Sequence, residues 1–478
     1  WLIRKPCWGE TARARRLLLK RLRHGQRLEV LKFLTSLRPF PDLAPCNRLQ
    51  ELAITKSIAG FRNFWEEKMS KVLKSLLVGT ALTCASAASA IELEVTHWWT
   101  SGGEAAAVTE LAKAWDATGN TWLDGAIAGS GGVARPIIIS RILGGDPMAA
   151  TQLNHGRQAE ELIEAGLMLD LTDIAEAGGW KDIVKPSGLL DACTLDGKIY
   201  CVPINIHSWQ WLWLSNQAFA DAGVDTPTNW EEFAASADAL RAAGKVPLAM
   251  GAQGWQQSGA FGVIAVAIAG SDAWRAVNVD KNAEVAAGPE YSKVFEAAVA
   301  ARDMAKDGNV QDWNQATNMV ITGAAGGQIM GDWAQGEFQV AGQTAGAEYE
   351  CLPGLGNNAV LDTSGDAFYF PLNSDPEITA AQKELAALMI SPEVQVAFNL
   401  KKGSLPVRGD IDMAAANNCM QKGLDILASG NILPSGDMNL SADTSTQIED
   451  LMLEFWSGDT MSAADAQARY AEIIGSAD

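Results

Sequence analysis

The chain has 478 residues and a formal net charge of −20 at pH 7. This length accommodates two or more domains. The charge is uneven, because residues 1–90 hold 17 Lys and Arg against 6 Asp and Glu, which leaves 20 basic and 51 acidic residues from Ile91 onward. A segment this acidic repels nucleic acids and anionic membrane surfaces, so neither is expected as a partner.

Residues 69–90 have the pattern of a secretory signal peptide. Met69 and two lysines precede the apolar run Leu76–Leu82, and Ala88-Ser89-Ala90 supplies an A-x-A cleavage site. We expect export, with cleavage after Ala90. Residues 1–68 are then expected to be upstream sequence translated in frame, the alternative being a basic arm that binds nucleic acid or anionic lipid. No run of about 18 apolar residues follows the signal, so no membrane span is expected.

Four of the seven cysteines lie after the signal: Cys193, Cys201, Cys351 and Cys419. An even number in an exported chain suggests two disulfides. A tight turn at Asp196-Gly197 would make the first two cysteines diagonal neighbours on a hairpin, which is within reach of a disulfide. We expect these two to pair, and the second pair follows by elimination.

The first predicted elements follow the signal directly. Ile91, Leu93 and Val95 alternate with polar residues and predict a strand over 91–96. After the loop "WWTSGGE", apolar residues at helical spacing predict a helix that includes Val108, Leu111, Ala112 and Trp115. A strand, a glycine loop and a helix in this order open an α/β unit.

Later helices are marked by their first residues or by an apolar stripe. Thr228 and Glu231 form a capping box that predicts one helix, and Ser391-Pro392 predicts the start of another. Near the C-terminus, one helix is predicted by the apolar stripe Ile448, Leu451, Met452 and Phe455, and a last one by the capping pair Ser462 and Asp465. A strand over 246–251 follows the first of these helices. Two α/β domains without a low-complexity linker fit this pattern.

Catalytic and metal-binding motifs are weak. The three histidines after the signal, His97, His155 and His207, have no zinc-ligand spacing, and neither a P-loop nor G-x-S-x-G occurs. We therefore expect no enzyme, no metal and no cofactor. Two alternatives stay open: a secreted glycoside hydrolase that uses a carboxylate pair, and a transport receptor that binds a metal through these histidines.

Tryptophan is the unusual residue, since 14 of the 17 follow Ala90. Trp115, Trp213 and Trp230 fit core positions. Five others stand in glycine-rich or polar contexts typical of loops: Trp98, Trp99, Trp255, Trp313 and Trp333. For these five, a position in the core and a position facing a ligand are about equally expected. An indole covers the apolar face of a sugar ring while neighbouring polar side chains bind its hydroxyls. The pattern favours a carbohydrate pocket.

At this point the sequence resembles a known family. The export signal, "WWTSGGE", "DGKIYCVPINIHS", "GDWAQGEF" and "KGSLPVR", in this order, resemble the extracellular solute-binding proteins of bacterial sugar ABC transporters, most of all the glucose/mannose-binding group. The resemblance covers residues 91–478. It implies a monomeric periplasmic receptor without catalysis, which captures a monosaccharide and delivers it to the permease subunits of an ABC importer.

The resemblance also implies the α/β fold and its division. Two lobes are expected to close on the ligand about a hinge. The N-terminal lobe would comprise 91–204 and about 350–366, and the C-terminal lobe 205–349 and about 367–478. The crossings would lie near "VPINIH", near Cys351 and near "FYFPLN".

The ligand contacts expected from the resemblance and from the loop tryptophans form one set, which comprises Trp98, Trp99, Glu104, Gln152, Asn154, His207, Trp255, Trp313, Asp332, Trp333, Asp366, Lys402 and Asp437. Asn154 stands where some relatives carry histidine, and Asp437 stands where relatives often carry histidine. Because discrimination between sugars depends on which polar groups would be left unpaired, this departure leaves the exact sugar open.

Overall fold

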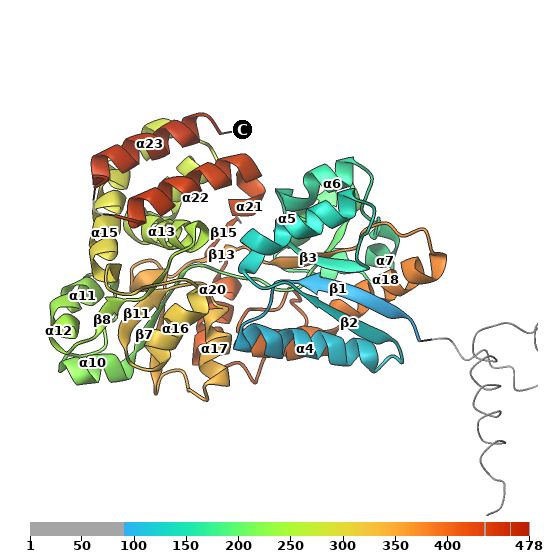
Figure 1. Ribbon diagram of the computed structural model, residues 1–478, viewed down its shortest axis with the longest axis horizontal. Helices are drawn as coiled ribbons and strands as arrows, with labels where there is room; N and C mark the ends of the chain where they lie inside the picture. The colour runs from blue at the N-terminus through green and yellow to red at the C-terminus, as the bar shows by residue number, and fades with distance from the viewer. Residues whose placement is uncertain (1–89, 435, 459, 478) are drawn as a thin grey trace, which may run out of the picture. The chain divides into compact units, whose positions relative to one another are not determined.

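The computed structural model describes residues 90–434, 436–458 and 460–477. The extension and the expected signal peptide lie outside the described residues, except for Ala90. From Ala90 onward the chain forms two α/β lobes, each built on its own sheet (Figure 1). This is the predicted fold class.

The first lobe contains a five-stranded sheet in the order β2-β1-β3-β14-β6. Its strands are β1 (Glu92–His97), β2 (Thr121–Ala126), β3 (Ala150–Asn154), β6 (Cys201–Pro203) and β14 (Asp366–Tyr369). The first three run parallel, and β14 lies antiparallel between β3 and β6. Leu93 and Val95 of β1 are fully buried, and the alternation predicted for this strand holds over Glu92–Val95. It ends there, because Thr96 is also fully buried.

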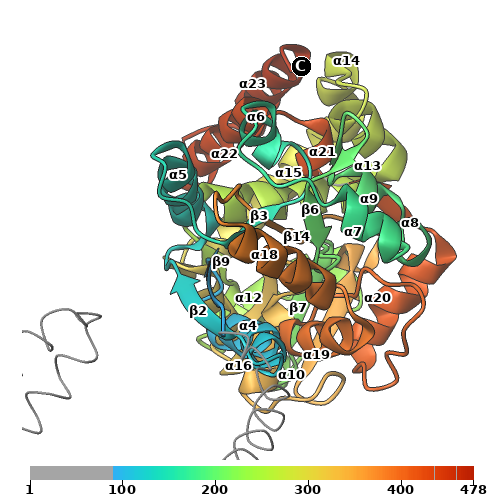
Figure 2. The same cartoon turned by 90° about the vertical axis from the view of Figure 1, so that its right-hand side faces the viewer.

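Helices cover this sheet from both sides. Helix α4 (Gly102–Asp116) packs against α18 (Pro376–Met389) and α19 (Pro392–Lys402), whereas α5 (Ser130–Leu143) packs against β3 on the other side (Figures 1 and 2). Ser101 and Glu104 form a capping box at the start of α4. The buried stripe of α4 includes Val108, Leu111 and Trp115, as predicted, whereas Ala112 is only partly buried.

The second lobe contains a four-stranded sheet in the order β12-β7-β11-β8. Its strands are β7 (Trp211–Ser215), β8 (Val246–Leu248), β11 (Ala325–Ile329) and β12 (Tyr349–Pro353). All five residues of β7, "WLWLS", are buried. Trp211 and Trp213 stack on one face, and the alternate leucines belong to a second apolar core on the other. Helices therefore cover both faces of this sheet.

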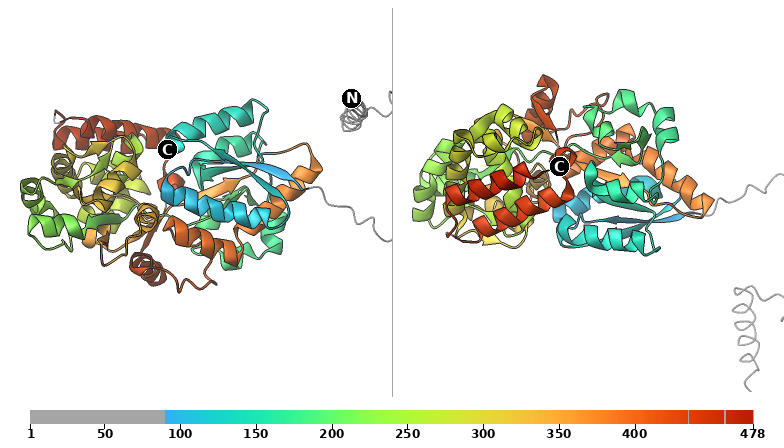
Figure 3. Two further views of the ribbon diagram at one scale, coloured as in Figure 1. Left: turned by 60° about the horizontal axis from the view of Figure 1, so that its bottom comes forward. Right: turned by 90° about the horizontal axis from the view of Figure 1, so that it is seen from above.

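The helices of the second lobe include two C-terminal ones that pack beside two long central ones. These are α13 (Gly254–Asn278), α15 (Pro289–Ala305), α22 (Ala442–Trp456) and α23 (Ala463–Gly475). Figure 3 shows the last two, in red, on the lobe drawn mainly in green and yellow. The predicted stripe of α22 is buried, and Ser462 caps α23 through the Asp465 amide, as predicted.

The remaining elements are short. In the first lobe and at its edge they are η1 (Arg157–Ala159), α6 (Glu160–Glu164), α7 (Thr172–Ala177), α8 (Trp180–Ile183), α9 (Gly188–Asp191), β4 (Thr194–Leu195) and β5 (Lys198–Ile199). Elsewhere they are α10 (Asn216–Ala222), α11 (Trp230–Ala235), α12 (Ala237–Ala242), β9 (Met250–Gly251), α14 (Ala283–Ala286), β10 (Asn309–Val310), α16 (Trp313–Ile321), α17 (Ala334–Val340), η2 (Gly354–Gly356), β13 (Leu361–Thr363), α20 (Asn418–Ser429), β15 (Ile432–Pro434) and α21 (Gly436–Asn439).

Three chain segments run side by side between the sheets: 204–208, 362–366 and 403–407. Ile206 pairs with Leu405, and His207 pairs with Ser364, in isolated antiparallel bridges. The first of these segments contains Ile204–His207 of "VPINIH".

The other two predicted crossings are wrong. Cys351 lies in β12, which pairs with β7 of the second lobe, and "FYFPLN" begins in β14, which belongs to the first sheet. Residues from about 350 to 361 therefore belong to the second lobe. Helices α18 and α19, which were expected in the C-terminal lobe, pack on the first.

One helix boundary also differs from the prediction. The N-cap of α11 is Asn229, whose side chain accepts a hydrogen bond from the Glu232 amide at 2.9 Å. Thr228 instead donates its hydroxyl to the Glu232 carboxylate at 2.8 Å. The capping pair is thus one residue later than Thr228 with Glu231. Helix α19 begins at Pro392 with Ser391 at the N-cap position, as predicted, although the Ser391 side chain makes no capping hydrogen bond.

Both expected disulfides are present, Cys193–Cys201 and Cys351–Cys419. The first closes the hairpin β4–β5, in which Thr194 pairs with Ile199. The second ties α20 to β12.

Among the described residues, one helix, α13, is long and apolar enough to cross a membrane by length and composition. It turns at Gly270, whose φ is +83°, and its apolar side chains pack in the core of the second lobe. A core helix of this kind passes the same test of length and composition.

Candidate ligand-binding cleft

A cleft of about 830 Å³ lies between the lobes. The first lobe contributes the loop after β1 and the start of α5. The second lobe contributes the first half of α13, the start of α16 and part of α22. The crossing segments form its floor through His207 and Asp366. The fold therefore places loops from both lobes around one space.

Three half-buried tryptophans form a wall of the cleft, which we call the tryptophan wall: Trp209, Trp255 and Trp333. The ring centre of Trp209 lies 5.7 Å from that of Trp255 and 4.9 Å from that of Trp333. Two glycines make room for these rings, because a Cβ at Gly259 would clash with Trp209 and one at Gly331 would clash with Trp333. The wall offers apolar ring faces of the kind that cover a sugar ring.

The two tryptophans of the first loop differ from each other. Trp98 is half-buried, and its backbone amide is fixed by the Gln152 side chain at 3.0 Å. Trp99 lines the cleft with only 1% of its surface exposed, and it packs against Phe368 and Phe398. Trp98 therefore presents the accessible ring. Trp313, which is 6% exposed, lines the opposite lobe.

A buried ion pair stands beside the first loop. The Lys402 ammonium lies 3.0 Å from the Glu104 carboxylate, and both residues line the cleft. Lys402 ends α19 and Glu104 lies in the first turn of α4, so the packing of these helices brings the charges together. Pairing compensates much of the cost of burying each charge and leaves polar atoms at the cleft surface.

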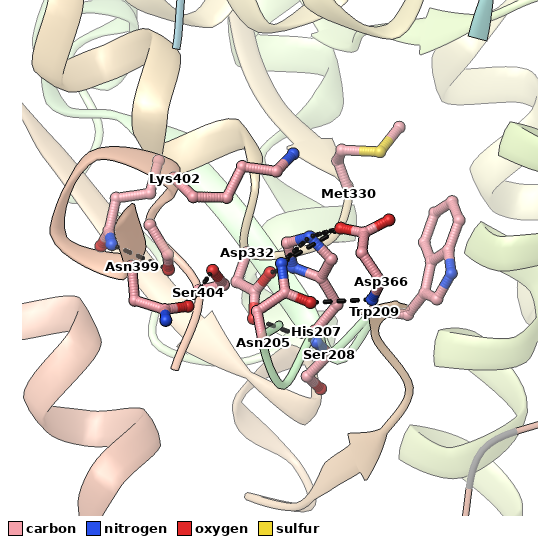
Figure 4. Close-up of polar contacts among 12 residues, drawn as sticks. Asn205, His207, Ser208, Trp209, Met330, Asp332, Asp366, Asn399, Lys402 and Ser404 are labelled. Atoms are coloured by element: carbon pink, nitrogen blue, oxygen red, sulfur yellow. Dashed lines mark hydrogen bonds and ion pairs between the residues drawn. The ribbon is translucent and has the colours of Figure 1, made fainter. Parts of the chain in front are cut away.

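His207 is the centre of a buried polar group that joins the lobes (Figure 4). Its Nδ1 lies 2.5 Å from an Asp332 oxygen, and its Nε2 lies 2.9 Å from an Asp366 oxygen. Burial alone would lower the pKa of His207, but the two carboxylates and their hydrogen bonds raise this pKa to about 9. The imidazolium form therefore predominates at neutral pH.

Neighbouring side chains fix Asp366 in place. Gln152 donates to one carboxylate oxygen at 2.7 Å and Asn205 donates to the other at 3.1 Å. Although burial alone would raise the pKa of Asp366, the positive charges of His207 and Lys402 hold it well below its usual range. Asp366 thus remains an ionised acceptor at the floor of the cleft.

Asp362 is a further buried carboxyl of the cleft. It accepts hydrogen bonds from the Ser208 hydroxyl and from the Trp209 backbone amide, each at 2.9 Å. Burial is the main cause that raises its pKa to about 6, and these hydrogen bonds oppose the rise. Through the Trp209 amide, Asp362 also fixes one member of the tryptophan wall.

Ten of the thirteen expected residues line the cleft: Trp98, Trp99, Glu104, Asn154, His207, Trp255, Trp313, Trp333, Asp366 and Lys402. Gln152 and Asp332 are buried outside the lining and hold other residues in place, so neither is positioned as a direct contact. The side chain of Asp437 lies outside the described part of the chain.

Sequence reasoning missed Trp209 and Asp362. Trp209 was hidden because "WQWLWLS" reads as one strand, although β7 begins only at Trp211. The polar pair His207-Ser208 just before it was the available signal that the strand had not yet begun.

Within residues 90–434, 436–458 and 460–477, no group of three or more His, Cys, Asp or Glu side chains is arranged to hold a metal ion. His97 and His207 each contact an aspartate instead. The three histidines that could have formed a metal site are thus not gathered into one.

Known proteins share this architecture. The family described as bacterial extracellular solute-binding protein matches residues 99–396. The chain belongs to this family. A "Probable sugar-binding periplasmic protein" of Brucella melitensis is 34% identical over 373 residues, which span 76% of this chain and 88% of that protein. A protein of the same description from Rhizobium meliloti is 34% identical over 366 residues, with 76% and 87% covered.

Solved structures give the same fold at lower sequence identity. A "Chitin oligosaccharide binding protein" superposes with a TM-score of 0.65 at 19% identity and covers 80% of this chain and 98% of its own. The bacterial solute receptor AcbH, described as having an exclusive preference for β-D-galactopyranose, has the same TM-score, identity and coverage. Identity this low supports the fold and leaves the ligand open.

Proposed function

We propose that this protein is the periplasmic sugar receptor of an ABC importer. It would capture a monosaccharide of the glucose or mannose type in the cleft, as a monomer, and deliver it to the permease subunits. The tryptophan wall carries the proposal, because three ring faces beside buried, charged hydrogen-bonding groups match the two surfaces of a sugar. The relatives described as probable sugar-binding periplasmic proteins support the class of ligand and the location.

The proposed contacts follow from the geometry of the cleft. Either Trp333 or Trp209 would stack on the apolar face of the ring, because the planes of these two indoles are nearly perpendicular to each other, at 87°. Trp98 would approach from the first lobe. Asp366 and the Glu104–Lys402 pair would bind hydroxyls, since charge-assisted hydrogen bonds are shorter and stronger than neutral ones.

The polar group of His207 and Asp366 lies in the crossing segments. A ligand that binds Asp366 would therefore contact the region where the lobes join, which suits a receptor that closes by hinge motion.

One observation favours a glycoside hydrolase as the second candidate. The environments of Asp362 and Asp366 push their pKa values apart, upward to about 6 for the first and downward for the second, as in an acid–base pair. Asp366, however, is held by His207 and Asn205. We propose the binding role, because these hydrogen bonds occupy the Asp366 carboxylate and hinder its protonation.

Calorimetric titration of the purified protein with D-glucose, D-mannose, D-galactose, D-xylose and maltose separates these candidates. We expect saturable binding of at least one monosaccharide and no release of reducing sugar from maltose or from longer glycans. Turnover of a glycan would favour the hydrolase, and no heat with any sugar would reject both.

A further inference from the structure

One hydrogen bond crosses the cleft near its edge. The Ser130 hydroxyl donates to the Gln253 side-chain oxygen at 3.2 Å. Ser130 begins α5 in the first lobe, and Gln253 is the residue that precedes α13 in the second. The distance exceeds the usual range of about 2.5–3.0 Å for an O–H···O bond, so this contact is weak and can release when the lobes separate.

The backbone of Ser130 indicates that its side chain matters. Its φ is +64°, in the left-handed region that favours glycine. Its neighbours are Gly129, with φ +105°, and two further glycines. Glycine at position 130 would adopt this conformation without strain. Strained residues of this kind cluster at ligand clamps and switch regions, and the hydroxyl is what serine adds here.

Gln253 is held ready by its own lobe. Its oxygen also accepts the Trp255 indole N–H at 2.5 Å, and its amide nitrogen donates to Asp312 at 3.1 Å. The orientation of the amide is therefore fixed whether or not Ser130 is in contact. Because Trp255 belongs to the tryptophan wall, the same amide links the cross-cleft contact to the stacking surface.

We propose that the Ser130–Gln253 bond is a clasp that closes the cleft over a bound sugar, with Gln253 as the positioning residue that ties the clasp to Trp255. The inference rests on the proposed function and specifies how the site retains its ligand. Loss of one neutral hydrogen bond should speed sugar release about 2- to 10-fold. The association rate should change less, since affinity changes at one interface lie mostly in the dissociation rate.

Two substitutions at one position separate the hydroxyl from the backbone strain. S130A removes the hydroxyl and keeps the strain, S130G removes both, and S140A on the exposed side of α5 is the control. Dissociation of the tightest sugar of the panel is measured by stopped-flow displacement. We expect faster release from S130A and S130G and wild-type release from S140A. If S130G, which also lacks the hydroxyl, releases sugar like the wild type, the hydroxyl does not retain the sugar and the clasp is wrong.

A double-mutant cycle tests whether the two residues act through one bond. Q253A should speed release more than S130A, because it also frees Trp255. Adding S130A to Q253A should then change nothing further. Fully additive effects would overturn the clasp.

A ligand-free measurement decides the clasp even if no sugar binds. Hydrogen exchange of the backbone amides at 129–134 should be faster in S130A than in S140A, because the turn loses its partner on the other lobe. Equal exchange in the two variants would overturn the clasp. Absence of binding by every sugar would reject the proposed function and leave this comparison valid.

Discussion

Replacing Trp333 should weaken sugar binding, whereas replacing Trp115 should lower the stability of the fold. Trp333 is half-buried in the tryptophan wall, with its ring centre 5.0 Å from that of His207. Trp115 is fully buried on α4. If sugar stacking resembles the stacking of bases on aromatic side chains, Trp333→Ala should lose about 1–3 kcal/mol of binding, or about 5- to 150-fold in affinity.

Trp115→Ala should act mainly on the fold. Removing a buried tryptophan leaves a cavity, and the free energy of unfolding should fall by about 3–5 kcal/mol, with sugar affinity nearly unchanged in the molecules that remain folded. Paired calorimetric titrations and denaturant melts of the two variants measure both quantities. If Trp333→Ala binds D-glucose and D-mannose like the wild type yet melts much earlier, Trp333 is a core residue and the stacking role is wrong.

The remaining predictions concern charge and disulfides. The pKa of His207 is raised from 6.5 to about 9, so protonated His207 should stabilise the fold by at most roughly 3 kcal/mol. This contribution should be complete below pH 6.5 and should be lost as the pH rises through 9. Urea melts at pH 7 and 9.5 should show this loss in the wild type and a smaller one in His207→Gln; equal losses would contradict the assignment. Removing Cys351–Cys419, which spans 68 residues, should destabilise more than removing Cys193–Cys201, which spans 8, by roughly 2 kcal/mol on loop entropy. Melts of the two double-serine variants measure this, and an equal or reversed order would count against it.

Local signals in the sequence predicted the elements well. The strand at Ile91–Val95 and the starts of α19 and α23 have short-range causes, namely alternation and capping. The path of the chain between the lobes was predicted only in part. Strands as short as "YECLP" and "DAFY" carry no sequence signal that specifies a partner strand, so β12 and β14 were assigned to the wrong side of the crossing.

For the candidate site, the sequence indicated some features of the cleft lining and left others open. Polar context separated the half-buried Trp98, Trp255 and Trp333 from Trp115 in the core. The same context also marked Trp99 and Trp313, which are buried. It could not tell which ring of the Trp98-Trp99 pair faces the cleft, because adjacent residues share one context and packing decides between them. Nor could it separate a ligand contact from a supporting residue. Gln152 and Asp332 carry suitable polar groups, yet the strands and loops around them turn those groups toward Asp366 and His207.

The structure of the protein with its bound sugar tests the central claim most directly. Crystals grown with the tightest sugar of the panel should show the ring in the cleft between the lobes, with its apolar face against Trp333 or Trp209 and a hydroxyl bound to Asp366. A sugar bound outside this cleft, or inside it without contact to the tryptophan wall, would contradict the account.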